Sequence, residues 1–296
     1  MFHRITLWCL FYFLILLTIA FAQEQNPYRQ VENTDEPDID MFIAHWEDSE
    51  PRFLYGFLEV RDILTEIEGD PLQPSKKGAV LTDLNSVSFA FLKAHTSTNP
   101  STLKGKQQIF YITSGEGTIK SGSTTADLYD GIGVVIPPGV RFSITNSVEE
   151  PLTMYIIEEP VPAGFKTNKK MLVKYEYDNK ISTNVRRVDI GDWLFSILDG
   201  LTTLVSFNPM MQEPMSMSPP NLHQEGTEEV WIAVKGDLQL QYGEQRRKFR
   251  MGSAYKVPEN GKTPHTNINQ TEISKKLLWM MKVPVEENQR PKRRVM

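Results

Sequence analysis

An internal repeat constrains the fold of this chain more than any other feature. When the 296-residue sequence is shifted by 121 residues, Gln108 falls on Glu229, and three residues that control turns coincide as well. The coinciding pairs are Gly115 with Gly236, Gly131 with Gly252, and Pro137 with Pro258. With two more residues of offset, Asn146 falls on Asn269. Because these anchors share one register, the sequence predicts two copies of one domain.

Short runs of β-type residues, separated by Gly, Pro, Asn and Asp, fill both copies. Residues 87–92 and 108–113 are examples in the first copy, and residues 201–207 and 230–234 are examples in the second. Many short strands at close spacing, without a long helical run, are typical of an all-β sandwich or barrel. Hydrophobic residues make up 40% of the chain, which is enough for two separate cores.

The predicted organisation places two barrels between a leader and a tail. We expect a signal peptide (1–22), an acidic N-terminal arm (23–77), a first barrel (78–163), a linker (164–185), a second barrel (186–284) and a basic tail (285–296). The arm is expected to be extended, with one short amphipathic helix over Leu58–Ile67, because its apolar residues recur at helical spacing.

The N-terminus has the features of an export signal. One positive charge within residues 1–4 precedes the apolar run Ile5–Ala22, which ends in a small-x-small site before Gln23. The alternative is an uncleaved anchor, because the run approaches the minimum length of a membrane span. The only cysteine, Cys9, lies within this run, so the mature chain would be stabilised by its cores rather than by disulfides. We expect a secreted or periplasmic protein that leaves the membrane after cleavage.

Charge limits the partners that the chain is expected to bind. The formal net charge is −5, which gives no reason to expect binding to nucleic acid or to an anionic membrane surface. The expected partner is therefore a small polar molecule.

The second copy contains two groups of polar residues at regular spacing. Its first group is His223, Glu225, Glu229 and Gly236, and its second is Gly252, Pro258, Gly261, His265 and Asn269. These groups resemble the two conserved motifs of the cupin superfamily, and the resemblance extends over about residues 78–283. It implies two double-stranded β-helix (cupin or jelly-roll) barrels with ligands pointing into the barrel, and a dimer through strand edges. Alternatively, two barrels in one chain pair those edges internally.

The motifs depart from the family pattern at three places. Glu225 stands where cupins usually have a second histidine, and Met217 replaces a glycine before the first motif. The turn between Pro258 and His265 is also two residues longer than the pattern. At these three positions the chain differs from the standard pattern of the family.

Strand geometry supports a metal site independently. Residues two apart on a strand share a face, so His223, Glu225 and Glu229 are expected to point the same way, with His265 joining from another strand. Two facing carboxylates raise each other's pKa unless a cation separates them. Ligands limited to N and O favour Mn(II), Fe(II) or Ni(II), with Zn(II) as an alternative. Glu225 is then either a fourth ligand or a general base. The competing interpretation is a barrel that has lost its metal.

The first copy lacks this ligand set. The positions of His223, Glu225, Glu229 and His265 are taken by Thr102, Lys104, Gln108 and Phe142. A lysine at such a site would repel a cation, so we expect a first barrel without metal. Its role is then structural, or it forms a small-molecule pocket lined by Phe142 and Lys104.

These observations favour a metal-dependent enzyme that acts on a small polar molecule in the second barrel. The resemblance implies oxygenase, oxalate-decarboxylase-like or isomerase chemistry, and Glu225 or Glu228 is expected to move a proton. The alternative is a non-catalytic cupin of the cell envelope that binds a metal or a small molecule.

Overall fold

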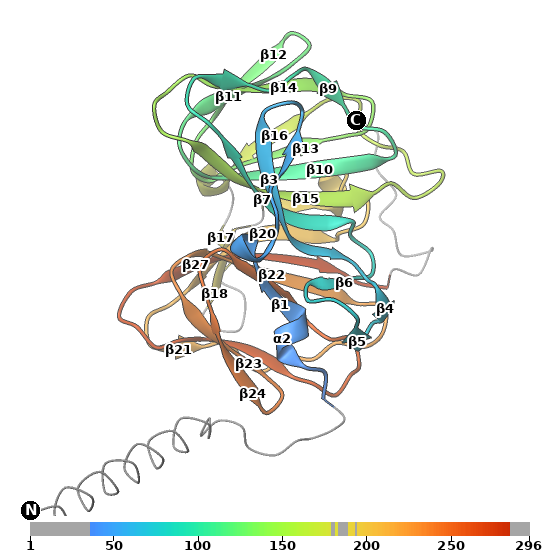
Figure 1. Cartoon of the computed structure of the whole chain (residues 1–296), viewed down its shortest axis with the longest axis vertical. Coiled ribbons are helices and arrows are strands. Elements are labelled where there is room, and N and C mark those ends of the chain that lie inside the picture. The colour runs from blue at the N-terminus through green and yellow to red at the C-terminus, as the bar shows by residue number, and fades with distance from the viewer. Residues whose placement is uncertain (1–35, 179–180, 183–188, 193, 285–296) are drawn as a thin grey trace, which may run out of the picture.

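The computed structural model describes residues 36–178, 181–182, 189–192 and 194–284. They form two β-barrels stacked along the long axis of the molecule (Figure 1), each built from one large and one small sheet that face each other. The predicted all-β fold with two barrels is confirmed. Among the described residues, no helix is long and apolar enough to cross a membrane. The predicted signal peptide and basic tail lie outside the described residues.

The first barrel consists of two sheets. Its large sheet runs in the order β16 (Leu172–Tyr175), β13 (Ile132–Ile136), β10 (Lys106–Ser114), β15 (Leu152–Pro160), β7 (Ser86–Leu92), β3 (Leu58–Glu66) and β2 (Arg52–Leu54), and β6 (Ala79–Leu81) pairs with β3. Its small sheet consists of β12 (Thr124–Leu128), β11 (Gly117–Ser121), β14 (Arg141–Asn146), β8 (Thr96–Ser97) and β9 (Ser101–Thr102).

The second barrel repeats this plan. Its large sheet runs in the order β1 (Ile43–His45), β25 (Ser253–Lys256), β22 (Glu228–Lys235), β27 (Lys275–Lys282), β20 (Ser206–Gln212), β18 (Asp189–Asp192) and β17 (Ile181–Ser182), and β19 (Phe195–Ser196) pairs with β20. Its small sheet consists of β21 (Ser216–Met217), β26 (His265–Asn269), β23 (Leu238–Tyr242) and β24 (Gln245–Phe249). The remaining elements are α2 (Ile39–Phe42), the hairpin β4 (Gly69–Asp70) and β5 (Gln73–Pro74), and the 3-10 turns η1 (Trp46–Asp48), η2 (Glu176–Asp178) and η3 (Ile197–Asp199).

The two copies share local irregularities as well as strands. A β-bulge interrupts the pairing after Ile112 in β10 and after Ala233 in β22, which are the same position in the repeat. The glycines that follow, Gly115 and Gly236, have φ values of 79° and 83°. A bulge increases twist and helps a sheet to close, so the repeat preserves the features that shape each barrel.

The predicted helix over Leu58–Ile67 is wrong, because residues 58–66 form strand β3. A bulge between Asp62 and Leu64 interrupts the pairing of β3 with β7. This bulge resets the in-out alternation, so that Ile63 and Leu64 are both buried and the apolar spacing imitates a helix. The short helix of the arm is instead α2, and the strands of the first barrel extend on both sides of the predicted range 78–163.

The N-terminal segment connects the two barrels. Strand β1 pairs with β25 at the edge of the second barrel, with Ile43 opposite Tyr255, and the chain then crosses to β2 and β3 in the first barrel. The Asp40 carboxylate forms an ion pair with Arg247 of β24, at 2.7 Å. This part of the acidic arm is therefore packed against the second barrel rather than solvated.

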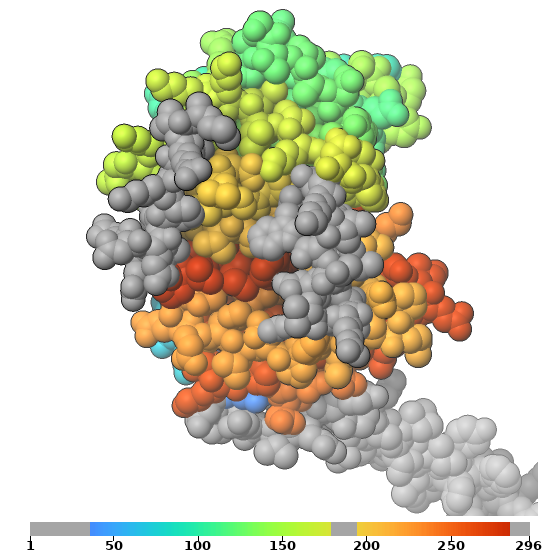
Figure 2. Space-filling model, turned by 180° about the vertical axis from the view of Figure 1, so that it is seen from behind, coloured from blue at the N-terminus to red at the C-terminus, as the bar shows by residue number. Residues whose placement is uncertain are grey.

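Two buried glutamates also form hydrogen bonds between the barrels. Glu228 of the second barrel accepts hydrogen bonds from the backbone N–H groups of residues 82–84 in the first. Glu159 of the first barrel accepts them from residues 203–204 in the second. A continuous apolar cluster lies around these contacts and includes residues of both large sheets. From behind, the green and yellow residues of the first barrel rest on the orange and red residues of the second (Figure 2).

Candidate metal centre

Three side chains of the second barrel converge at its interior. His223 lies in the loop before β22, Glu229 lies on β22, and His265 begins β26. One ligand atom from each residue lies within 4.8 Å of the other two. Glu229 and His265 are buried, and His223 is nearly so. The structure therefore brings together three of the four residues that the sequence predicts as metal ligands.

The Glu229 carboxylate is oriented by two indoles. Its Oε1 atom accepts hydrogen bonds from Nε1 of Trp231 and Nε1 of Trp279, both at 2.7 Å. Its Oε2 atom is buried without a hydrogen bond of ordinary geometry. That oxygen instead faces Nε2 of His223 and Nε2 of His265, the latter at 3.6 Å. The indoles thus hold one oxygen and direct the other toward the imidazoles.

The His265 ring is oriented by a tyrosine. Nδ1 of His265 lies 3.0 Å from the Tyr255 hydroxyl, which donates a hydrogen bond to Oδ1 of Asn267 at 3.2 Å. Because that hydroxyl proton is used on Asn267, we assign the His265 proton to Nδ1. Nε2 then carries a lone pair, and it is buried without a hydrogen-bond partner. A partner on the remote nitrogen is the usual way in which proteins fix a metal-binding histidine.

The electrostatics of the group fit a bound cation. Burial acts to raise the pKa of Glu229, but the nearby imidazoles of His265 and His223 outweigh burial and leave the pKa below its ordinary value. The carboxylate is therefore ionised. Its Oε2 atom and Nε2 of His265 are two acceptors that face each other inside a barrel, and a metal ion satisfies both.

The structure does not bring Glu225 to this group. Its side chain is exposed, and it contributes no atom to the cluster of three. The reason is a turn at Gly226, where φ is 83°, which breaks the alternation that would place Glu225 and Glu229 on one face. The predicted role of Glu225 as a fourth ligand or general base is therefore not supported by its position.

Glu228 does not lie at the site, so the prediction that it moves a proton there is wrong. Glu228 and Glu229 are neighbours on β22 and point to opposite faces of the sheet. The Glu228 carboxylate lies between the barrels, where it accepts hydrogen bonds from Thr82 and Leu84. Burial raises its pKa, in keeping with a structural position away from the metal ligands.

Sequence reasoning missed the residues that orient the ligands. Trp231 follows Glu229 by two residues on the same strand, so the period-2 alternation of a strand could have identified it. Trp279 and Tyr255 come from other strands, which pair with β22 at Trp231. Their proximity depends on strand register, and no feature of the local sequence indicates it.

The first barrel fills the corresponding space with aromatic rings. Gln108, at the position of Glu229, accepts a hydrogen bond from the Tyr55 hydroxyl at 2.6 Å. Phe142, at the position of His265, is buried and packs edge-to-face on Tyr55 with ring centroids 5.1 Å apart. Thr102 and Lys104 are both exposed at the surface. Phe142 and Lys104 therefore do not share a pocket wall.

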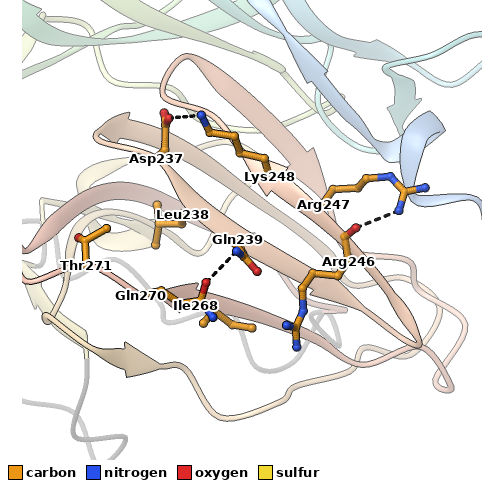
Figure 3. A pocket seen from close by; sticks show the side chains of 9 residues that line it. All are labelled: Asp237, Leu238, Gln239, Arg246, Arg247, Lys248, Ile268, Gln270 and Thr271. Atoms are coloured by element: carbon orange, nitrogen blue, oxygen red, sulfur yellow. Dashed lines mark hydrogen bonds and ion pairs between the residues drawn. The ribbon is translucent and has the colours of Figure 1, made fainter. Parts of the chain in front are cut away.

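A pocket of about 430 Å³ lies on the outer face of the second barrel's small sheet. Figure 3 shows its side chains, which come from β23, β24 and β26 and the turns beside them. Its cations are largely paired, because Lys248 contacts Asp237 at 2.6 Å and Arg247 contacts Asp40 at 2.7 Å. None of the three metal-ligand candidates lines it, so it is separate from the candidate metal centre.

Comparison with known proteins identifies the fold. No protein-family model matches the chain, and no curated protein sequence matches it. Among solved structures, a form of oxalate decarboxylase from Bacillus subtilis is similar with a TM-score of 0.63 and 12% identity, over 87% of this chain and 82% of that one. Protein YlbA of E. coli is similar with a TM-score of 0.60 and 11% identity, over 84% and 95%. Vicilin of Corylus avellana (hazelnut) is similar with a TM-score of 0.60 and 12% identity, over 81% and 85%.

These similar structures share the cupin barrel, and each aligns with most of both barrels of this chain. Identities this low establish a common fold and leave the activity open. The motifs in the second copy, the two facing sheets of each barrel and the structural matches agree with one another. The chain therefore has the two-barrel cupin fold.

Proposed function

We propose that the second barrel binds a divalent metal through His223, Glu229 and His265 and uses it in a metal-dependent reaction. The observation that carries this proposal is the pair of buried acceptors, Oε2 of Glu229 and Nε2 of His265, which face each other without a hydrogen-bond donor. Three protein ligands leave coordination positions for water or substrate, as in catalytic rather than structural metal sites.

The chemistry of such a site suits a small polar substrate. A divalent metal held there supplies polarisation of a bound oxygen or activation of dioxygen, which allows oxygenase, decarboxylase or isomerase reactions. Trp231 and Trp279 keep the Glu229 carboxylate in place, and Tyr255 keeps His265 in its ligand tautomer. The N and O donors favour Mn(II), Fe(II) or Ni(II), with Zn(II) as an alternative. A similar structure, oxalate decarboxylase of Bacillus subtilis, has Mn(II) centres.

Metal analysis of the purified protein tests the proposal. We expect close to one equivalent of Mn, Fe, Ni or Zn in the parent protein and a large loss in His265→Ala and Glu229→Gln. Glu225→Gln is the matched control, because its exposed carboxylate lies outside the group, and it should retain the metal. Near-zero metal in the parent protein after reconstitution would overturn the proposal. Circular dichroism checks that each variant is folded.

A second candidate is a non-catalytic cupin that binds a metal or a small molecule. It is favoured by the positions of Glu225 and Glu228, because neither carboxylate lies where it could exchange a proton with a substrate at the metal. Incubating metal-loaded protein with oxalate and other small acids, while following dioxygen and carbon dioxide, separates the candidates. Retained metal without turnover of any tested acid favours binding.

We also propose that the protein is exported and that residues 1–22 are removed. The support is the charged start, the apolar run and the small-x-small site before Gln23. N-terminal sequencing of the protein recovered from an envelope fraction should begin at Gln23. A start at Met1 would indicate an anchor instead.

A further inference from the structure

A second pocket, remote in sequence from the metal-ligand candidates, lies on the first barrel. It has a volume of about 880 Å³ and is formed by the turns around residues 114–116, 129–130 and 148–151 and by the segment that follows β16. Its aromatic wall consists of Phe91, Tyr129, Tyr175 and Tyr177. Its lining includes no lysine, arginine or histidine among the described residues.

Three tyrosines stand at steep angles to one another in this pocket. The rings of Tyr129 and Tyr175 have centroids 5.2 Å apart and an interplanar angle of 66°. The rings of Tyr175 and Tyr177 have the same separation and an angle of 69°. Tyr129 is 40% exposed and Tyr177 is 68% exposed, so part of each ring is open to a ligand, while Nζ of Lys276 lies over the Tyr177 ring at 6.0 Å from its centroid. Both contacts are edge-to-face, and the exposed parts of the Tyr129 and Tyr177 rings offer the electron-rich surface that attracts an organic cation.

A buried glutamate holds these rings in place. Glu176, between Tyr175 and Tyr177, is buried and accepts a hydrogen bond from the Tyr111 hydroxyl at 2.6 Å. Its other oxygen contacts Nζ of Lys276 at 2.6 Å, and its backbone N–H donates to the carbonyl of Gly131 at 3.1 Å. Because the side chain of Glu176 points inward, the tyrosines on either side are fixed at the surface before any ligand arrives.

Among the described residues that line the pocket, the charged side chains are all acidic. Glu116, Asp130 and Glu150 line it, and neither Glu116 nor Glu150 forms an ion pair with another described residue. The nearby Lys276 lies 3.8 Å from Asp130, but it is buried and closer to Glu176. Carboxylates beside aromatic faces attract cations and repel anions.

We propose that this pocket binds a small organic cation of the alkylammonium class. The cation would lie against the exposed rings of Tyr129 and Tyr177, with the carboxylates of Asp130 and Glu150 beside it. The pocket is distinct from the proposed metal centre and does not depend on it. The pocket of Figure 3, with three cationic side chains in its lining, has the opposite character.

Titration of the full chain with choline chloride tests the proposal. Isothermal calorimetry, or proton NMR of the tyrosine rings, should show saturable binding of choline. The neutral isostere 3,3-dimethylbutanol should bind at least tenfold more weakly, because it has the same shape without the charge. Equal binding of choline and 3,3-dimethylbutanol, or no saturable choline binding, would overturn the proposal.

Variants locate the binding to this pocket. Tyr177→Ala and Glu150→Gln should each weaken choline binding, by about tenfold for the ring and less for the carboxylate. Both side chains are at the surface, so both variants are expected to fold. Phe53→Ala removes another exposed aromatic ring, on β2 of the same barrel, and should bind choline like the parent. If Tyr177→Ala binds choline with unchanged affinity, the pocket assignment is wrong.

Discussion

A single tyrosine hydroxyl is expected to control metal affinity. Tyr255→Phe removes the group that fixes Nδ1 of His265, and loss of such an orienting hydrogen bond typically lowers metal affinity about 10- to 100-fold. We expect that decrease in a competition assay with a chelator. Tyr242→Phe is the matched control, because the Tyr242 hydroxyl is buried without a hydrogen-bond partner. Its metal affinity should stay within about threefold of the parent, and an equal decrease in both variants would contradict the role of Tyr255.

At this scale the sequence predicts ligands better than it predicts their surroundings. His223, Glu229 and His265 follow from motif spacing, and the structure places them together. The predicted ligand role of Glu225 fails, because a positive φ at Gly226 interrupts the strand alternation on which that prediction depended. Tyr255 supports its histidine from a different strand, and such contacts depend on register that no local pattern encodes.

At the scale of elements, a glycine turn after the bulge of β10 is expected to be sensitive to any side chain. Gly115 has a φ of 79°, and a Cβ there would lie 2.4 Å from the Pro151 carbonyl oxygen. Gly115→Ala therefore adds a backbone clash to the cost of about 1–2 kcal/mol for the left-handed conformation. Gly139→Ala has a similar φ of 80° with no atom within 4 Å. Urea unfolding should show a clearly larger loss of stability for Gly115→Ala, and equal losses would contradict the clash.

Elements were predictable where their pattern was regular. The runs 87–92 and 108–113 fall within β7 and β10, because both are short, rich in β-branched and aromatic residues, and largely buried. Strand β3 was predicted as a helix because its bulge places Ile63 and Leu64 on the buried side together. A bulge is decided by the partner strand, so single-strand periodicity cannot reveal it.

At the scale of the whole molecule, the repeat predicts two barrels and says nothing of how they meet. Their interface depends on two buried glutamates, each on a large sheet, that cap a loop of the opposite barrel. Glu228 appeared in the sequence as a neighbour of a metal ligand, and its actual partners are about 145 residues away in the chain. Contacts of that range are fixed only when both barrels are complete, which is why the sequence alone suggested a proton-transfer role for Glu228 at the metal site.

The second interface glutamate makes the stability of the whole molecule depend on pH. Burial raises the pKa of Glu159 above its ordinary value, although hydrogen bonds from residues 203–204 and Gln107 oppose the rise. A carboxyl whose pKa is higher in the folded state stabilises the fold most below the unfolded value of 4.5, and that stabilisation is lost as the pH rises through the folded pKa.

Replacing Glu159 with glutamine should remove this part of the pH dependence. Gln107 can turn its amide, whose Oε1 lacks a hydrogen-bond partner, to accept from the new side chain. Relative to Glu159→Gln, the parent should lose free energy of unfolding as the pH rises above 4.5, by at most about 1.4 kcal/mol per pH unit. Urea unfolding at several pH values measures the difference, with Glu225→Gln as an exposed-carboxylate control. The free energy of unfolding of the parent, minus that of Glu159→Gln, should fall with pH. If this difference stays constant or increases with pH, burial does not dominate at Glu159, and the interface hydrogen bonds hold its carboxylate ionised.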